Sequence, residues 1–153
     1  MHTAPQKPQR GRPRDNDLDQ KILQAAWELL GDMSLSELTI HGIAQHAGTT
    51  RPAIYRRWKS VEGIVIDSLL DVVGEKVATP QEGDPPEQLR EYIWLLAKFL
   101  QSRVGRVVAE ILGRGQSDPE LMVKFHNVFL LPRRDHGKSI IQIGQERGFF
   151  RTD

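Results

Sequence analysis

The chain has 153 residues but no cysteine, and only 7% of its residues are aromatic. Without cysteine it forms no disulfide, thiolate zinc site or iron–sulfur cluster, and it offers no cysteine nucleophile. No apolar run approaches the roughly 18 residues that a membrane-spanning helix needs. The N-terminal residues lack the apolar segment of a secretion signal. We therefore expect a protein without a membrane partner that stays in the cytoplasm.

Motifs of common enzyme classes are also missing. The five histidines form no His-x-x-x-His pair and no His-Glu-x-x-His motif, so no metal site is predicted. The sequence contains neither a phosphate-binding GxxxxGK[ST] loop nor a GxSxG nucleophile elbow. Its acidic residues are scattered, and no pair of carboxylates stands out for acid–base catalysis. The sequence therefore predicts neither an enzyme nor a bound cofactor.

Positive charge is concentrated near the N-terminus, although the net charge of the whole chain is only +1. Residues 1–60 carry nine Lys or Arg and six Asp or Glu, whereas residues 61–153 carry twelve and fourteen. The basic arm, residues 1–14, contains no acid and four cations: Lys7, Arg10, Arg12 and Arg14. Like charges in a Pro/Gly-rich segment repel one another, so we expect the arm to be disordered alone and to lie along an anionic polymer. A solubilising tail is the alternative, but Gly11-Arg12-Pro13 resembles the core of an AT-hook, which enters narrow A·T minor grooves.

Apolar residues recur at helical spacing along the rest of the chain, and alternating β-type runs are absent. The predicted fold class is therefore all-α. The expected helices span about residues 17–30, 40–47, 51–58, 61–73, 87–103, 104–112, 119–131 and 132–148. The fifth is apolar on most sides, so we expect it to be buried on most sides. Pro132 is expected to break the seventh helix and to open the eighth.

Residues 40–58, IHGIAQHAGTTRPAIYRRW, have the pattern of a helix-turn-helix. That motif needs two short helices at a steep angle, joined by a tight turn. Ala44 is small where the two helices would cross, and Gly48 permits the positive φ that the turn requires. Ile43, Ala47 and Ile54 would fill the space between the helices.

The exposed side of the third helix is predicted to be basic. It would present Thr50, Arg51, Tyr55, Arg56 and Arg57, followed by Lys59. Residues 50–59 hold four cations and no acid. Hydroxyl groups position phosphates and arginine reads guanine in the major groove, so this mixture favours DNA binding. An ordinary helical hairpin with a solvated basic face is the alternative.

Residues 18–70 resemble the N-terminal domain of TetR-like (tetracycline-repressor-like) bacterial transcriptional regulators. The matching features are Ile22–Leu30, Thr39, Ile43-Ala44, Ala47-Gly48, Thr50, Ile54-Tyr55, Trp58 and Ser60. Downstream, SDPELMVKF, Pro132-Arg133-Arg134 and the terminal ERGFFRTD resemble the regulatory domain of the family. The resemblance implies three DNA-binding helices and a larger helical domain that binds a small molecule and dimerises. It also implies two further helices, which we expect this chain to lack.

The resemblance assigns roles by position. It places Thr39, Thr50, Tyr55 and Lys59 at phosphates, and Arg51, Pro52, Ala53 and Arg56 at bases. Arg57 stands where histidine is frequent in the family, which adds charge for a phosphate contact. Thr49 replaces the usual aliphatic turn residue, and Pro52 replaces a small flexible one. Because of these departures the resemblance implies DNA binding but does not specify the operator sequence.

The C-terminal half offers candidates for a ligand pocket with one polar handle. They are Trp94, Phe99, Met122, Phe125, His126 and Phe129. An ordinary core built from the same side chains is the alternative.

These observations predict a sequence-specific repressor that a small-molecule effector releases from a palindromic double-stranded DNA operator. It would act as a homodimer on the bacterial nucleoid. The predicted domains are the basic arm (1–14), a DNA-binding domain (15–60) and a ligand-binding and dimerisation domain (61–153) with a linker near 79–86. Two alternatives are a ligand-free architectural DNA-binding protein and a helical module whose basic face binds an acidic partner.

Overall fold

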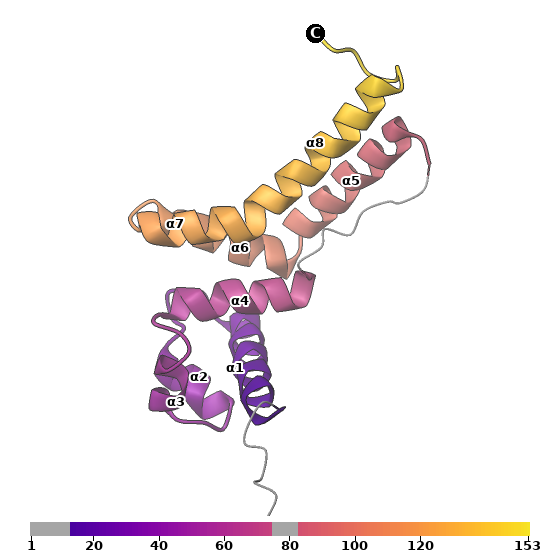
Figure 1. Cartoon of the computed structure of the whole chain (residues 1–153). Coiled ribbons are helices and arrows are strands. Elements are labelled where there is room, and N and C mark those ends of the chain that lie inside the picture. Colours follow the sequence, from indigo (N-terminus) through magenta and orange to yellow (C-terminus); the bar gives the residue numbers. More distant parts are fainter. Residues whose placement is uncertain (1–12, 75–82) are drawn as a thin grey trace, which may run out of the picture.

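The computed structural model describes residues 13–74 and 83–153, and within these residues the chain forms helices and turns with no strand. This confirms the all-α prediction. The elements are α1 (Pro13–Asp32), α2 (Ile40–His46), α3 (Arg51–Tyr55), α4 (Val61–Val73), α5 (Pro85–Leu100), α6 (Arg103–Gly115), α7 (Pro119–Phe125), the π-helical turn η1 (His126–Leu130) and α8 (Leu131–Glu146). Figure 1 shows α1, α2 and α3 as one cluster, α4 lying across it, and α5–α8 beyond α4. No helix in this described part is long and apolar enough to cross a membrane.

The first helix is longer than the sequence indicates. We expected residues 17–30, whereas α1 begins at Pro13 and ends at Asp32. Proline suits the start of a helix because its missing N–H would have no partner there. The helix therefore includes the last two residues of the predicted basic arm, and residues 1–12 lie outside the described part.

The first three helices enclose a common core. Ile22 and Leu30 of α1, Ile43 of α2 and Ile54 of α3 are fully buried. Burying a side chain of this size contributes about 1.5–3 kcal/mol relative to leaving it exposed. This core fixes the orientation of the short helix α3, which has too few residues to be stable alone.

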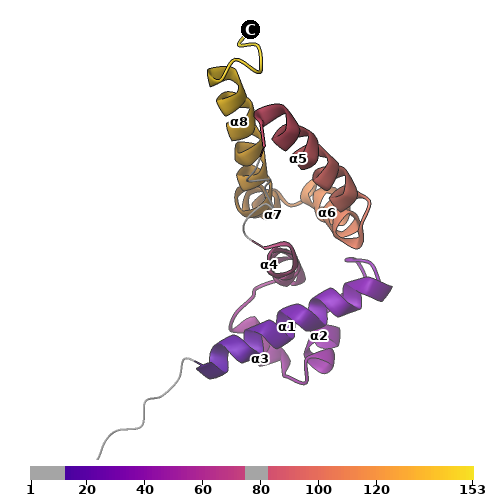
Figure 2. The same ribbon diagram turned by 90° about the vertical axis from the view of Figure 1, so that its right-hand side faces the viewer.

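Helix α4 connects the two halves of the molecule, and Figure 2 shows it end-on between them. Ile64, Val65 and Ile66 are consecutive and all inaccessible to solvent. Consecutive residues point to different sides of a helix, so α4 is covered on several sides. It contacts α1 on one side and α7 on the other.

Helices α5 and α8 lie side by side and extend away from α4 (Figure 1). The Tyr92 hydroxyl on α5 donates a hydrogen bond of 2.7 Å to the Arg133 carbonyl on α8. The Tyr92 ring also passes close to Gly137, where a Cβ would lie 3.1 Å from a ring carbon. Gly137 therefore allows the two helices to approach each other.

The boundary between the fifth and sixth helices differs from the prediction. Helix α5 ends at Leu100 rather than near residue 103, and α6 runs on to Gly115. Ser102 accounts for the difference, because its hydroxyl accepts a hydrogen bond from the Val104 amide and caps α6. Gly105 permits the tight connection, since a Cβ there would lie 2.1 Å from the Leu100 carbonyl oxygen.

The expectation for Pro132 is half right: it lies in the first turn of the eighth helix as predicted, but it does not interrupt the helical chain. The chain passes from α7 through η1 directly into α8, and Pro132 is the second residue of α8. The bend between α7 and α8 in Figure 1 coincides with η1, as expected of a π-helical turn. Pro132 is tolerated because its missing N–H falls in the first turn of α8.

The expectation that the fifth helix is buried on most sides is also wrong. Ile93, Trp94 and Leu100 are 56%, 54% and 54% exposed. Only Pro85 and Tyr92 of α5 are buried. Within the described part of the chain, α5 packs on α8 and α6 and leaves its other apolar side uncovered.

Candidate DNA-binding surface and ligand cavity

Hydroxyl side chains define the starts of the helices around the predicted helix-turn-helix. The Thr39 hydroxyl accepts from the Gly42 amide at 3.0 Å, and the Thr50 hydroxyl accepts from the Ala53 amide at 3.4 Å. Both threonines are exposed. A hydroxyl that accepts from a backbone amide keeps its own proton, which can be donated to a phosphate.

The turn between α2 and α3 has the predicted geometry. Gly48 has φ = 62°, a conformation that residues with a Cβ rarely adopt. The Thr49 amide then donates to the Ala44 carbonyl at 2.9 Å. Ala44 itself is only 3% exposed, as expected for a small residue at a helix crossing. The turn therefore presents α3 at a fixed angle to α2.

One side of α3 and the turn after it is exposed and basic. This recognition face consists of Arg51, Pro52, Tyr55, Arg56 and Lys59. Tyr55 is 57% exposed, an unusual position for a large aromatic ring. No Asp or Glu of the described part forms an ion pair with a cation of the recognition face, so its charges remain available to an anionic partner.

Two residues that the sequence assigns to DNA lie elsewhere. Ala53 is only 6% exposed and belongs to the core. Arg57 directs its guanidinium inwards, where it bonds to Asp19 of α1 and donates to the Ala53 carbonyl at 3.0 Å. Its side chain is 15% exposed. Arg57 therefore attaches the end of α3 to α1, a role that the basic pattern around it conceals.

The arginines of the basic arm are placed only in part. Arg14 lies in the first turn of α1. Arg10 and Arg12 lie outside the described residues.

A second polar contact attaches α2 to α1. His46 Nε2 lies 2.8 Å from a carboxylate oxygen of Glu28. The pKa of Glu28 is lowered, first by this hydrogen bond with His46 and then by one from Gln24. The contact favours the ionised form of Glu28 in the folded chain.

Asp67 on α4 links the DNA-binding half to α7. It accepts a hydrogen bond of 2.7 Å from the Trp58 indole through one oxygen and one of 3.1 Å from Lys124 through the other. At the start of α4, Glu62 pairs with Arg114 of α6 at 3.0 Å. The C-terminal turns of α6 and α7 are thus each bonded to α4.

Helix α6 also holds the C-terminal end of α1. Arg106 donates to the Leu30 carbonyl at 2.6 Å, and Arg103 donates to the Trp27 carbonyl. Carbonyls near a helix C-terminus carry partial negative charge, which favours cations there. Helix α6 is therefore bonded to α1 as well as to α4.

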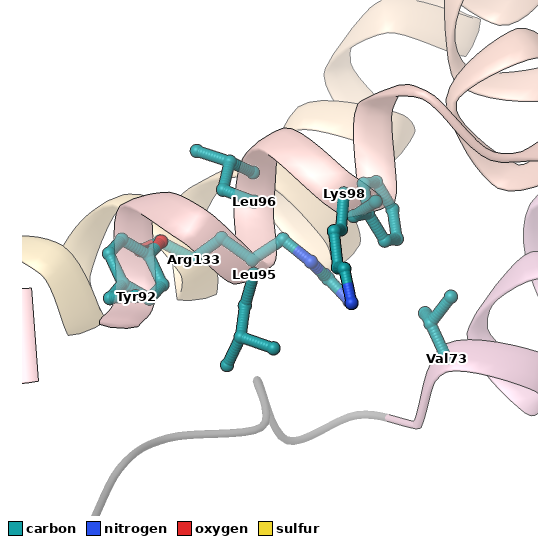
Figure 3. Close-up of a pocket in the computed structure, with 7 residues that line it drawn as sticks. Val73, Tyr92, Leu95, Leu96, Lys98 and Arg133 are labelled. Atoms are coloured by element: carbon teal, nitrogen blue, oxygen red, sulfur yellow. Dashed lines mark hydrogen bonds between the residues drawn. The ribbon is translucent and has the colours of Figure 1, made fainter. Parts of the chain in front are cut away.

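A cavity of about 330 Å³ lies in the C-terminal half, at the low end of the range for ligand sites. Its lining comes from α4, α5 and α8 and consists of Val73, Tyr92, Leu95, Leu96, Lys98, Phe99 and Arg133. Figure 3 shows Leu95, Lys98 and Arg133 extending into this space opposite Val73. Behind Tyr92, the His136 ring lies edge-on at 5.3 Å, and its buried Nε2 has no hydrogen-bond partner in the described part of the chain.

Of the six predicted ligand contacts, Phe99 is the one that lines this cavity. Phe125 and Phe129 stack on each other at 4.9 Å and belong to the core. Trp94 and His126 are exposed, and Met122 packs beside Gly115. The sequence signal that could have indicated the cavity is Tyr92, which carries a hydroxyl within an apolar stripe, whereas Arg133 lies among polar residues and gives no such signal.

The fold and the recognition face define a helix-turn-helix DNA-binding protein. Residues 22–67 match the model of the bacterial regulatory proteins of the tetR family, and residues 79–153 match a tetracyclin repressor-like C-terminal domain. The chain is 32% identical over 144 residues to the uncharacterized HTH-type transcriptional regulator YdeS of Bacillus subtilis (strain 168), covering 94% of this chain and 73% of that protein. It is 26% identical over 140 residues to the HTH-type transcriptional regulator AqdR of Rhodococcus erythropolis, covering 92% and 67%. The chain belongs to the TetR family and is a DNA-binding transcriptional regulator.

Proposed function

We propose that this regulator is a repressor that binds a palindromic operator as a homodimer and leaves it when a small molecule binds the C-terminal half. The observation that carries the DNA side of the proposal is the recognition face, which is exposed, cationic and free of acidic partners in the described part of the chain. Action at an operator would place the protein on the bacterial nucleoid.

The geometry favours two kinds of DNA contact among the predicted residues, to phosphates and to base edges. Thr39, Thr50, Tyr55 and Lys59 hold phosphates with hydroxyl and ammonium donors. Arg51 and Arg56 reach base edges in the major groove, where the guanidinium fork matches guanine O6 and N7. Pro52 offers ring contact only. We leave Ala53 and Arg57 out of the interface because the first is buried and the second is bonded to α1.

The ligand response is supported by the connections of α4 and α6. The cavity lies against Val73 at the end of α4, whereas Asp67 of the same helix bonds to Trp58 next to the recognition face. A ligand that favours one position of α4 would therefore alter the separation of two recognition faces in a dimer. Two such faces must lie about one helical turn of DNA apart to occupy both half-sites.

The connections of α4 also support a division of the chain into two domains. Residues 15–60 form the DNA-binding domain and residues 61–153 the ligand-binding and dimerisation domain, with α4 as the shared element. The basic arm would add phosphate or minor-groove contacts to the first domain.

Selection of bound duplexes from a random library at physiological salt tests this function. A recovered palindrome is expected, with a preference of about 10³–10⁷ over random DNA. A ligand-free architectural protein, the second candidate, would bind in a salt-sensitive manner without enriching any sequence. Small molecules are then screened for release of the protein from the recovered duplex, and a library without any releasing compound would argue against the ligand response.

A further inference from the structure

The cavity between α4, α5 and α8 combines apolar walls with positive charge. Its apolar lining residues are Val73, Leu95, Leu96 and Phe99. Its charged lining residues are Lys98 and Arg133, and its described lining includes no acid. In Figure 3 both cationic side chains extend into the same space.

Arg133 is held in place without a carboxylate. Its Nη1 donates to the Phe129 carbonyl at 2.8 Å, and its guanidinium carbon lies 3.8 Å from the centroid of the Phe129 ring. In the described part of the chain this is its one side-chain hydrogen bond, and no ion pair involves it. A guanidinium has five N–H donors, so most of them remain available to a ligand.

The position of Arg133 is costly for an isolated charge. Burial lowers the pKa of its guanidinium, although arginine still stays protonated at neutral pH. Arg133 is partly buried, and its hydrogen bond to the Phe129 carbonyl and its contact with the Phe129 ring replace part of the lost hydration. An anion that enters the cavity would supply a counter-ion, which the described lining residues do not, and could accept two parallel hydrogen bonds from the guanidinium.

We propose that the cavity selects an amphipathic organic anion. Its carboxylate or sulfonate pairs with Arg133, its apolar body packs on Leu95, Leu96 and Phe99, and Lys98 adds attraction at the rim. The inference rests on the proposed function in one respect, because it names the class of small molecule that the C-terminal half binds.

Two fluorescent probes with the same ring system test the proposal on the full chain. They are 8-anilinonaphthalene-1-sulfonate, an apolar anion, and N-phenyl-1-naphthylamine, which lacks the sulfonate. We expect the anion to bind at least about tenfold more tightly, since a charge-assisted pair in an apolar site is worth this much or more. Equal affinities, or tighter binding of the uncharged probe, would overturn the proposal without recourse to any variant.

The matched variants are Arg133→Met and Arg134→Met. Arg134 is the adjacent arginine, is exposed, and pairs with Asp135 outside the cavity. Arg133→Met should remove the preference for the anion and retain the uncharged probe, whereas Arg134→Met should leave both affinities unchanged. Retention of the preference in Arg133→Met would contradict the assignment. If Arg133→Met loses both probes, Arg133→Gln replaces it, because glutamine keeps a donor for the Phe129 carbonyl without the charge.

This measurement and the test of the proposed function fail in different ways. An anion preference that depends on Arg133 but has no effect on the operator complex would leave the anion site standing and overturn the ligand response. Release of DNA by uncharged compounds alone would support the ligand response and overturn the anion site.

Discussion

Arg56 and Arg57 are neighbours in the sequence but have different surroundings, which gives a sharp test of the DNA-binding surface. Arg56 is exposed on the recognition face, whereas Arg57 bonds to Asp19 and to the Ala53 carbonyl. Replacing either arginine by methionine removes the charge and keeps a long unbranched side chain. Arg57→Met should therefore affect stability, and Arg56→Met should affect DNA binding.

The expected magnitudes follow from these contacts. A hydrogen bond to a charged group contributes about 1.5–3 kcal/mol. Asp19 is 39% exposed, so solvent screening reduces its share. We expect Arg57→Met to lose about 2 kcal/mol, or about 4–8 °C in Tm for a chain of this size. Arg56→Met should stay within about 0.5 kcal/mol of the parent in stability and lose about 1–3 kcal/mol of specific DNA affinity.

Urea unfolding and fluorescence anisotropy with the selected operator measure the two effects. Anisotropy is recorded well below the Tm of both variants, over a series of salt concentrations. The reasoning is refuted if Arg57→Met unfolds like the parent while it weakens DNA binding and lowers the salt slope by about one phosphate contact. It is equally refuted if Arg56→Met destabilises the chain and leaves the operator affinity unchanged.

Three further predictions concern the operator, the basic arm and pH. Arg51→Ala should cost about 1–3 kcal/mol on the preferred duplex and relax one position of the selected site, and an unchanged consensus would exclude a base contact. Deletion of residues 1–12, which removes three cations, should weaken binding and flatten the salt dependence, and an identical salt slope would show that the arm makes no phosphate contact. Because the pKa of Glu28 is lowered in the folded chain, its contact with His46 stabilises above the ordinary carboxyl value of 4.5 and is lost as the pH falls through the lower folded value. Glu28→Gln should therefore flatten the decline of the urea midpoint below about pH 4.5, and a parallel decline in both proteins would contradict this assignment.

Local interactions made much of the fold predictable. Helix starts at Thr39, Thr50 and Ser60 follow from hydroxyl groups that bond to amides three residues ahead. The turn at Gly48 follows from the freedom of glycine at positive φ. These contacts lie within a few residues of the chain, so composition and spacing are enough to recognise them.

The errors arose where a distant segment decides the outcome. The apolar pattern of α5 is real, but a pattern does not show which of its sides a neighbouring helix covers. The cause at Pro132 is local instead: the π-helical turn at residues 126–130 comes directly before it, and the chain continues into α8 without a break.

The sequence by itself determined that this chain is all-α and contains a basic helix-turn-helix, because these features depend on periodicity, helix caps and charge. Its role as a regulator followed from its resemblance to the TetR family. Only the tertiary structure decided that Arg57 turns inwards to Asp19 and that Arg133 faces a cavity whose described lining residues include no carboxylate. Both outcomes depend on residues far apart in sequence that folding brings together. The sequence does not distinguish Arg57 from Arg133, because the role of each depends on the residues that surround it in the folded chain.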